Sequence, residues 1–201
     1  IALEVMLPKL IFEKKNAAAI TVWWVLILIY ASLRFDDGVH VAPSSLEMTP
    51  EALLGVVWQT KVERTRRGTR FAVPTCSISG VEWLAMGWDL FKPHISDRDY
   101  FVWELKSEKE FNEAPVTYSR GLSWLKAFML RGINETRILK LVEVNEMDEL
   151  EKAVREVTWH SMRVTMLSEA VKAQVDGKIV GLQANWKDPS QLVLKYARQR
   201  K

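Results

Sequence analysis

Residues 17–33 read AAAITVWWVLILIYASL, and this stretch decides how the chain folds. It carries no charged residue, and it runs directly into Arg34, Asp36 and Asp37. A membrane-spanning helix needs about 20 apolar residues, so the stretch is slightly short for that role. We interpret it as a helix buried on all sides in the core of the fold. A membrane anchor is the alternative interpretation.

The size and composition indicate one folded domain. The chain has 201 residues, of which 48% are hydrophobic and 26% are charged. A chain of this length can bury one sizeable core, and this composition excludes an intrinsically disordered protein. Nine tryptophans are present, and most of them should lie in the core or at its edge.

The segments around the apolar stretch predict an α+β fold that is mainly helical. Helical patterns cover 2–15, 17–33, 79–91, 118–130, 146–156, 161–173, 177–184 and 190–200. Short β-type runs cover 40–42, 46–48, 54–58 and 70–73. These runs predict a small antiparallel sheet with a basic β-hairpin tip. The polar stretch 104–116 is typical of a surface loop.

The distribution of charge indicates a polyanionic partner more clearly than the net charge of +3 does. Basic residues gather in two places, which are Lys61, Arg64, Arg66, Arg67 and Arg70, and Lys195, Arg198, Arg200 and Lys201. Acidic residues gather instead between 143 and 156. Such segregation favours one basic face, as in a DNA-binding protein. Charge runs that are merely solvated faces are the plainer explanation.

Several classes of site are excluded by residue types. Cys76 is the single cysteine and the chain has three histidines, so neither a disulfide framework nor a cysteine-based zinc site is expected. No glycine-rich phosphate loop is present. We therefore expect neither a metal nor another cofactor.

Phosphodiester cleavage without a metal requires a side-chain nucleophile, cationic donors for the phosphate oxygens and an acid for the leaving oxygen. The sequence supplies these types in the order Arg34, Lys61, His160, Arg163, Trp186 and Tyr196. His160 and Arg163 are three residues apart, which places them on one face of a helix. Singly, each residue has a plainer role, such as a helix cap, a solvated turn lysine, a core tryptophan or a packing tyrosine.

As an ordered set, these residues resemble the tyrosine recombinase or phage integrase family. The resemblance extends from about Ser32 to Lys201 and is strongest in 31–37 (ASLRFDD), 158–163 (TWHSMR) and 185–190 (NWKDPS) leading to Tyr196. The sequence around Leu33 and Trp186 also resembles recombinase-like genes of eukaryotic mobile elements. The resemblance implies an integrase-like catalytic domain.

The resemblance also implies roles for individual residues. Tyr196 would attack the scissile phosphate and form a 3′-phosphotyrosine, while Arg34 and Arg163 clamp the non-bridging oxygens. Lys61 would protonate the leaving 5′ oxygen. His160 would help to deprotonate Tyr196 or would hydrogen-bond the phosphate, and Trp186 would add another donor. Asp37 would support the site from behind.

The partners follow from the same resemblance. Double-stranded DNA is the expected partner, with additional contacts from Arg64, Arg66, Arg67, Lys187 and Arg198, and self-assembly on DNA as a dimer or tetramer is expected. Residues 1–201 would form a single catalytic domain without the family's N-terminal DNA-clamping domain. The reaction would occur in the nucleus of a eukaryote, or otherwise in the cytoplasm or nucleoid.

Two alternatives stay open within DNA chemistry. A telomere-resolvase-like or type IB topoisomerase-like enzyme would use similar chemistry. A recombinase-derived module would bind DNA without turnover.

Overall fold

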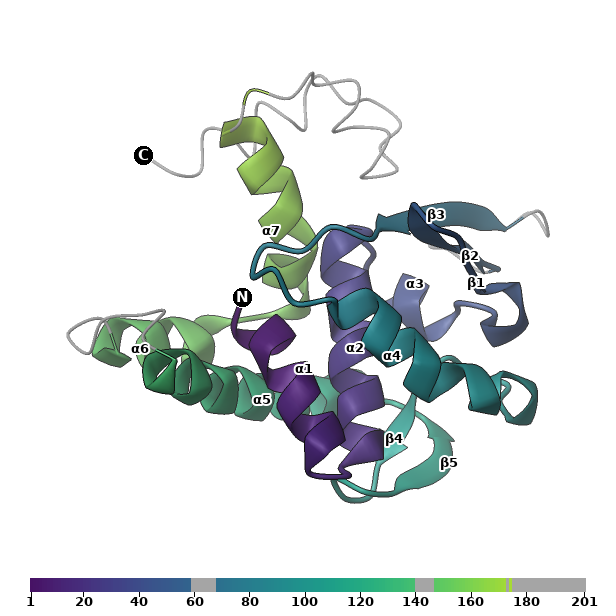
Figure 1. Ribbon diagram of the computed structural model, residues 1–201, viewed down its shortest axis with the longest axis horizontal. Coiled ribbons are helices and arrows are strands. Elements are labelled where there is room, and N and C mark those ends of the chain that lie inside the picture. The colour runs from purple at the N-terminus through teal and green to yellow at the C-terminus, as the bar shows by residue number, and fades with distance from the viewer. Residues whose placement is uncertain (59–67, 140–146, 173, 175–201) are drawn as a thin grey trace.

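The computed structural model describes residues 1–201 except for 59–67, 140–146, 173 and 175–201. The described part of the chain is mainly helical, with a small antiparallel sheet and a separate hairpin (Figure 1), which confirms the predicted mixture of elements. The elements in chain order are α1 Ala2–Phe12, α2 Asn16–Tyr30, α3 Phe35–Val39, the 3-10 helix Pro43–Ser45, β1 Glu47–Met48, β2 Ala52–Val57, β3 Thr69–Pro74, α4 Trp83–Phe91, the 3-10 helix Lys92–Asp97, β4 Trp103–Leu105, β5 Phe111–Pro115, α5 Tyr118–Ile138, α6 Met147–Glu156 and α7 Trp159–Lys172.

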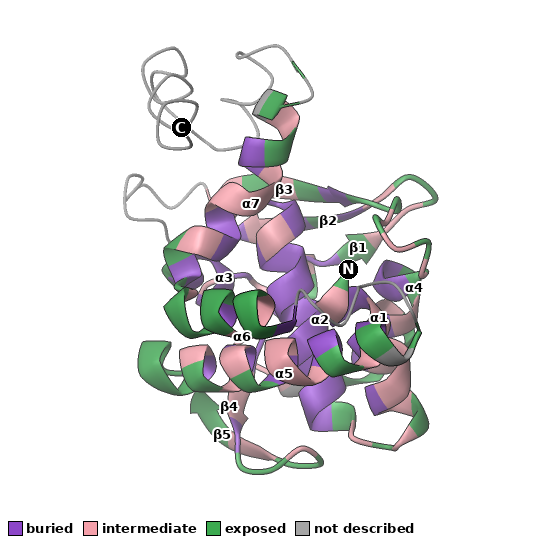
Figure 2. Cartoon of the chain, turned by 90° about the vertical axis from the view of Figure 1, so that its left-hand side faces the viewer, coloured by how far each residue is buried: buried purple, intermediate pink, exposed green. Residues whose placement is uncertain are grey.

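The apolar stretch forms α2, which lies at the centre of the core as predicted. Helices α1, α4, α5 and α7 all pack on it, and Figure 2 shows it almost entirely buried. Trp23 has no exposed surface, and its ring lies 5.4 Å from Phe91 and 5.6 Å from Phe101. A helix surrounded in this way needs apolar side chains on every face. Among the described residues, no helix is long and apolar enough to cross a membrane.

The predicted sheet is confirmed as three antiparallel strands in the order β1-β2-β3. Along β2 the side chains of Leu53 and Val57 are buried, and those of Leu54 and Val56 face outward, which is the alternation of a half-buried strand. The turn before β2 is closed by Thr49, whose backbone N–H and hydroxyl both donate to the carbonyl of Ala52. The sheet therefore has a buried inner face and an open outer face.

The first predicted strand, 40–42, is reduced to one bridge between Val41 and Val57. Pro43 begins a 3-10 helix directly afterwards. Because proline has no backbone N–H to donate to a ladder, pairing cannot continue through this residue.

The prediction of a surface loop at 104–116 was wrong, because β4 and β5 form an antiparallel hairpin there. Leu105 is buried and pairs with Phe111. The guanidinium of Arg98 lies 4.5 Å from the ring centre of Trp103 and 4.6 Å from that of Phe111. Cation–π contacts and a few apolar residues hold this hairpin, while the surrounding polar residues hide its alternation in the sequence.

The remaining helices agree with the predictions except at their ends. Helix α4 begins at Trp83, later than the predicted residue 79, because Gly80 has a φ of 78° and a right-handed helix cannot include that conformation. Helix α5 continues to Ile138. Helices α6 and α7 occupy their predicted places. The predicted helices 177–184 and 190–200 lie outside the described residues.

Candidate phosphate-binding site

The structure describes four of the residues that the sequence predicts for the site, which are Arg34, Asp37, His160 and Arg163. The others lie outside the described residues, namely Lys61, Arg64, Arg66, Arg67, Trp186, Lys187, Tyr196 and Arg198. The four described residues come from two regions far apart in the chain, which are the start of α3 with the residue before it and the N-terminal part of α7.

Arg163 joins these two regions. Its side chain is 7% exposed, and its Nε donates a hydrogen bond of 3.0 Å to the carbonyl of Ser32, which is 131 positions away. Arg34 follows Ser32 by two residues. The two arginines that the sequence predicts as a phosphate clamp are therefore held at one junction of the fold.

The carbonyl of Ser32 is available to Arg163 because α2 ends in a Schellman turn. Ser32 adopts a left-handed conformation with φ of 53°. Its N–H donates to Ile29 (3.2 Å), and the N–H of Leu33 donates to Leu28 (2.9 Å). These two bonds satisfy the last carbonyls of the helix and direct the chain away from the helix axis. Glycine usually occupies such a position, so Ser32 is strained there.

Arg34 begins the next helix, α3, in an extended conformation. Its backbone N–H donates to Oδ2 of Asp37 at 3.1 Å, which is the reciprocal contact of an N-terminal cap. The carboxylate of Asp37 is buried, and no described atom hydrogen-bonds its Oδ1. Asp37 thus supports the site through the backbone of Arg34.

The rings of Trp24, Phe35 and Trp159 form an aromatic wall that joins α2, α3 and α7. The ring of Trp159 lies 5.4 Å from that of Trp24 and 4.9 Å from that of Phe35. The indole N–H of Trp24 donates to the carbonyl of Gly38 at 3.1 Å. A Cβ on Gly38 would lie 2.2 Å from Cδ2 of Leu28, so a larger residue here would require the Leu28 side chain to move. The wall fixes the helix ends that carry Arg34 and Arg163.

His160 lies in the first turn of α7 and is exposed. Thr158 and Ser161 cap this helix reciprocally, since the backbone N–H of each donates to the hydroxyl oxygen of the other. The predicted spacing of His160 and Arg163 on one helix is present. Their environments differ, because Arg163 is buried against Ser32 and His160 lies at the surface.

Sequence reasoning missed Tyr118, which is 51% exposed. Its ring lies 5.3 Å from Phe35, and its carbonyl accepts the indole N–H of Trp159 at 3.1 Å. Tyr118 therefore contacts the residue after Arg34 and the residue before His160. No motif marks this tyrosine in the sequence, where it is simply the first residue of a helix.

A buried polar network fixes the last turn of α2 from the other side. The carboxylate of Glu4 accepts the hydroxyl of Tyr30 and the N–H of Ser79, the latter at 2.8 Å. The Tyr30 oxygen in turn accepts the N–H of Ile78 at 3.2 Å. Burial disfavours the charged carboxylate, yet the hydrogen bonds from Ser79 and Tyr30 hold the pKa of Glu4 below its usual value. Burial and the Glu4 carboxylate raise the pKa of Tyr30 far above its usual value, so Tyr30 stays protonated and structural.

Within the described residues, no group of three or more histidine, cysteine or acidic side chains is arranged to hold a metal ion. No family model matches the chain, and no curated protein matches it. The site is therefore defined by its own geometry, which is two arginines at one junction, a buried acid behind one of them and a surface histidine on the same helix as the other.

Proposed function

We propose that this chain is an integrase-like catalytic domain of a tyrosine recombinase, which cleaves and rejoins DNA through a covalent 3′-phosphotyrosine. The single observation that carries the proposal is the hydrogen bond from Arg163 to the carbonyl of Ser32, two residues before Arg34, which supports a shared site for the two arginines of the ordered set. Arginine binds phosphate oxygens in pairs and keeps its charge at all relevant pH values. A paired arginine site therefore suits a phosphodiester.

In the proposed reaction, the Tyr196 oxygen forms a bond to phosphorus while the bond from phosphorus to the 5′ oxygen breaks. Arg34 and Arg163 neutralise the charge that builds on the non-bridging oxygens. Lys61 supplies the proton to the leaving 5′ oxygen, and His160 receives the proton of the tyrosine. Trp186 donates its indole N–H to the phosphate. Because one ester replaces another, rejoining needs no external energy source and no cofactor.

The support behind the arginines fits such a reaction. Catalytic groups must be held within a fraction of an ångström of their productive positions. Asp37 fixes the backbone of Arg34, and the Trp159 wall fixes the start of α7. The double-stranded DNA partner, its added contacts from Arg64, Arg66, Arg67, Lys187 and Arg198, and assembly on DNA are part of the same proposal.

Covalent capture on nicked DNA tests the proposal. Duplexes recovered by binding selection from a random pool are resynthesised with a nick beside each candidate cleavage position, so that the cut end diffuses away. We expect a protein–DNA adduct that survives denaturant and that Tyr196→Phe abolishes, because phenylalanine has no oxygen to attack phosphorus.

Tyr118→Phe is the matched control, since it removes the hydroxyl of an exposed tyrosine whose ring contacts Phe35. It should leave the adduct unchanged. An adduct that depends on Tyr118 would overturn the assignment of the nucleophile. Retention of the selected duplexes without an adduct on any of them would instead indicate a recombinase-derived module that binds DNA without turnover.

A further inference from the structure

The outer face of the three-stranded sheet carries an aromatic side chain that nothing in the proposed reaction uses. Trp58 directly follows β2 and is 50% exposed. Val41 pairs with Val57, so the register places His40 directly opposite Trp58 on the same face. The backbone N–H of Trp58 donates to the carbonyl of His40 at 3.1 Å, which fixes this pairing.

His40 holds the indole ring in place. The two rings meet edge to face, with their centres 5.2 Å apart and their planes at 82°. The imidazole is itself anchored, because its Nδ1 lies 2.7 Å from the carbonyl of Asp36. On the other side, the register of β2 and β3 places Gly68 opposite Trp58, and glycine has no side chain to cover the ring. Trp58 is therefore oriented in advance and still open.

A cation lies on the same outer face as this ring. Arg70 pairs with Val56 on β3 and is exposed. Val56 and Trp58 lie two residues apart on one strand, so their side chains share the outer face, and Arg70 is diagonal to Trp58. Such diagonal neighbours are about 7–8 Å apart, within reach of long side chains. The outer face thus offers a flat ring and a phosphate-binding fork side by side.

Charge argues for a nucleic acid as the occupant. The nine residues after Trp58 contain Lys61, Arg64, Arg66 and Arg67 against the single acid Glu63. Asp36 is an exposed acid one helical turn before His40, and Glu47 is an exposed acid opposite Leu54 on the same face. A carboxylate there repels a phosphate and tolerates an uncharged base. This arrangement fits a base on Trp58 and a phosphate on Arg70.

The Trp58 ring also lies close to the candidate phosphate site. His40 caps the end of α3 that lies opposite Arg34. At about 1.5 Å per helical residue, the six steps along the chain from Arg34 to His40 span about 9 Å. A strand bound at Arg34 would therefore continue onto Trp58 within a few nucleotides.

We propose that Trp58, oriented by His40 and flanked by Arg70, stacks on an unpaired DNA base close to the phosphate held by Arg34. Bases of intact duplex are stacked on one another and present no free face, whereas unpaired bases stack on exposed aromatic rings whatever their sequence. Exchange of strands requires that nucleotides beside the cut leave their complement, and Trp58 receives one of them. The inference rests on DNA being the partner, as in the proposed function, and does not depend on cleavage.

Fluorescence anisotropy on the whole chain tests this inference with a short labelled single-stranded oligonucleotide of mixed sequence, and with the same strand paired to its complement. Trp58→Ala should weaken single-strand binding about tenfold, because one stacked base is lost, and should change duplex binding little. Trp58→Phe should retain most of the affinity. Arg70→Ala should weaken single-strand binding and lower its salt dependence by about one phosphate contact.

Phe12→Ala is the matched control. Phe12 is an 88% exposed aromatic residue at the end of α1. It lies just before the start of α2, whereas His40 and Trp58 come after the end of α2, and Phe12 takes no part in the proposed stacking. Its removal should leave both affinities unchanged. In addition, ultraviolet crosslinking of the unaltered protein to a bromodeoxyuridine strand, followed by peptide mapping, should give an adduct at Trp58, and this result does not depend on how any variant folds.

Equal losses on single-strand and duplex DNA after Trp58→Ala, or no loss on either, would overturn the stacking role, as would crosslinking that maps elsewhere. These outcomes differ from failure of the proposed function. If recombination is wrong and stacking is right, the wild-type chain binds single strands through Trp58 but forms no adduct on nicked duplexes. If stacking is wrong and recombination is right, Trp58→Ala forms the adduct and binds single strands like the wild type.

Discussion

Helices α1 and α2 end in the same type of backbone turn, but the turn after α1 is exposed and the turn after α2 is buried. Helix α1 ends through Lys14, with φ of 56°, and α2 ends through Ser32, with φ of 53°. In both, the N–H of the following residue reaches back across the last turn, from Lys15 to Leu10 and from Leu33 to Leu28. Lys14 is exposed, whereas Ser32 is 2% exposed.

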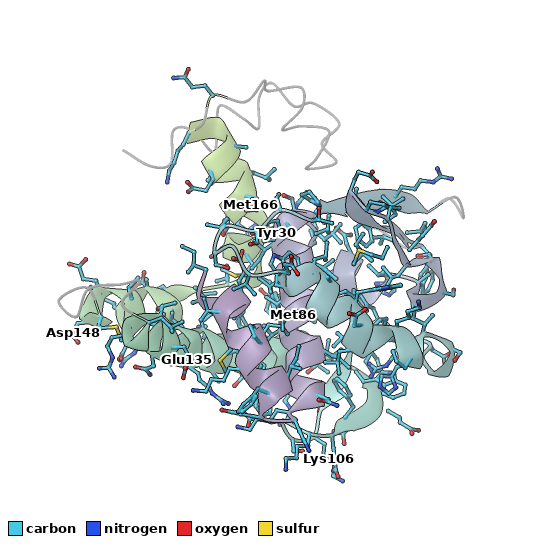
Figure 3. The ribbon with its side chains drawn as sticks, viewed as in Figure 1. Tyr30, Met86, Lys106, Glu135, Asp148 and Met166 are labelled. Atoms are coloured by element: carbon cyan, nitrogen blue, oxygen red, sulfur yellow. The ribbon has the colours of Figure 1, made fainter. Side chains whose placement is uncertain are left out.

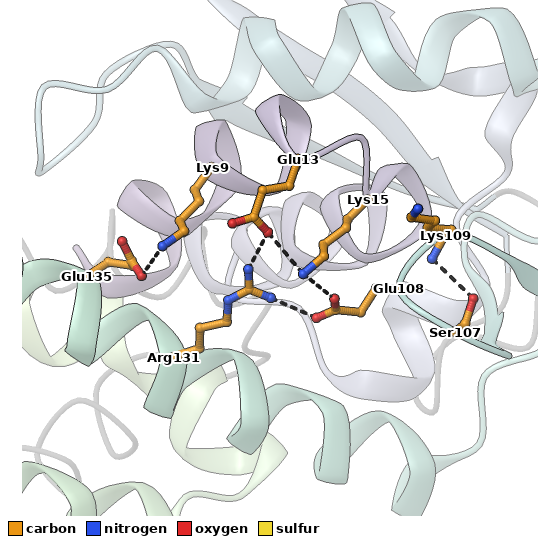
Figure 4. Close-up of polar contacts among 8 residues, drawn as sticks. All are labelled: Lys9, Glu13, Lys15, Ser107, Glu108, Lys109, Arg131 and Glu135. Atoms are coloured by element: carbon orange, nitrogen blue, oxygen red, sulfur yellow. Dashed lines mark hydrogen bonds and ion pairs between the residues drawn. The ribbon is translucent and has the colours of Figure 1, made fainter.

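Ion pairs surround the exposed turn (Figure 4). Lys15 contacts Glu13 at 3.0 Å and Glu108 at 2.6 Å. Arg131, from α5, contacts the same two acids. Solvent and salt screen such pairs, and each one contributes little to stability. This end of α2 is tied to α5 and to the β4–β5 hairpin by contacts that tolerate small movements.

The buried turn is held by packing and by hydrogen bonds that water does not reach. Arg163 binds Ser32, the aromatic wall packs behind it, and Tyr30 is bonded to Glu4 on the other side. Figure 3 labels Tyr30 at this end of the bundle and Lys106 at the opposite end. The same backbone turn is therefore surrounded by screened ion pairs at one end of α2 and by packing and buried hydrogen bonds at the other.

The first prediction tests whether the aromatic wall stabilises the buried turn, and it removes part of that wall. Trp24→Ala should lower the free energy of unfolding by about 3–5 kcal/mol, because it empties a fully buried volume and leaves the carbonyl of Gly38 without its donor. Chemical denaturation monitored by circular dichroism measures this loss. A loss below about 1 kcal/mol, within the range of surface substitutions, would show that the wall does not hold the buried turn.

The second is to change the acid behind Tyr30. Glu4→Ala should cost about 2 kcal/mol at neutral pH, since the hydroxyl of Tyr30 and the N–H of Ser79 lose a charged acceptor. The folded pKa of Glu4 lies below its usual value of 4.5, so its contribution is present above that pH and is lost as pH falls through the folded pKa. Stability curves of wild type and Glu4→Ala should converge in acid. Curves that stay parallel down to the acid limit would contradict this assignment.

The third compares the two turns directly through Lys14→Gly and Ser32→Gly. Each change removes a side chain from a left-handed position and so releases backbone strain. Glycine also makes the unfolded chain more flexible, which offsets part of this gain, so Lys14→Gly should raise the free energy of unfolding by about 0.5–1 kcal/mol. Ser32→Gly should gain more, because it also removes a buried hydroxyl that no described atom hydrogen-bonds. Thermal unfolding of the pair measures the difference, and a smaller gain for Ser32→Gly would mean that its hydroxyl has a role.

The sequence was sufficient for the elements with strong patterns. The uncharged run predicts α2 and its burial, because a helix without a polar face must be surrounded. The strands of the sheet follow from the short β-type runs. The hairpin at 103–115 could not be predicted, since its stability depends on Arg98 lying between two rings, a contact between residues that are not adjacent in the chain.

The site was predictable in its residue types and only in part in its geometry. The order of Arg34, His160 and Arg163 indicated a shared site. In the structure, Arg163 binds the carbonyl of Ser32, two residues before Arg34. That Ser32 would supply the carbonyl, or that Tyr118 would contact Phe35, depends on a left-handed backbone and on packing between α3 and α5. Such contacts leave no periodic signal in the sequence. The roles of Lys61, Trp186 and Tyr196 stay predictions.

The distance along the chain between Ser32 and Arg163 has a consequence for biosynthesis. Proteins are made from the N-terminus, and contacts between neighbouring segments form first. Ser32 leaves the ribosome 131 residues ahead of the arginine that binds it. A growing polypeptide therefore presents Ser32 without Arg163, and this contact forms only when α7 has been translated and has docked on the end of α2.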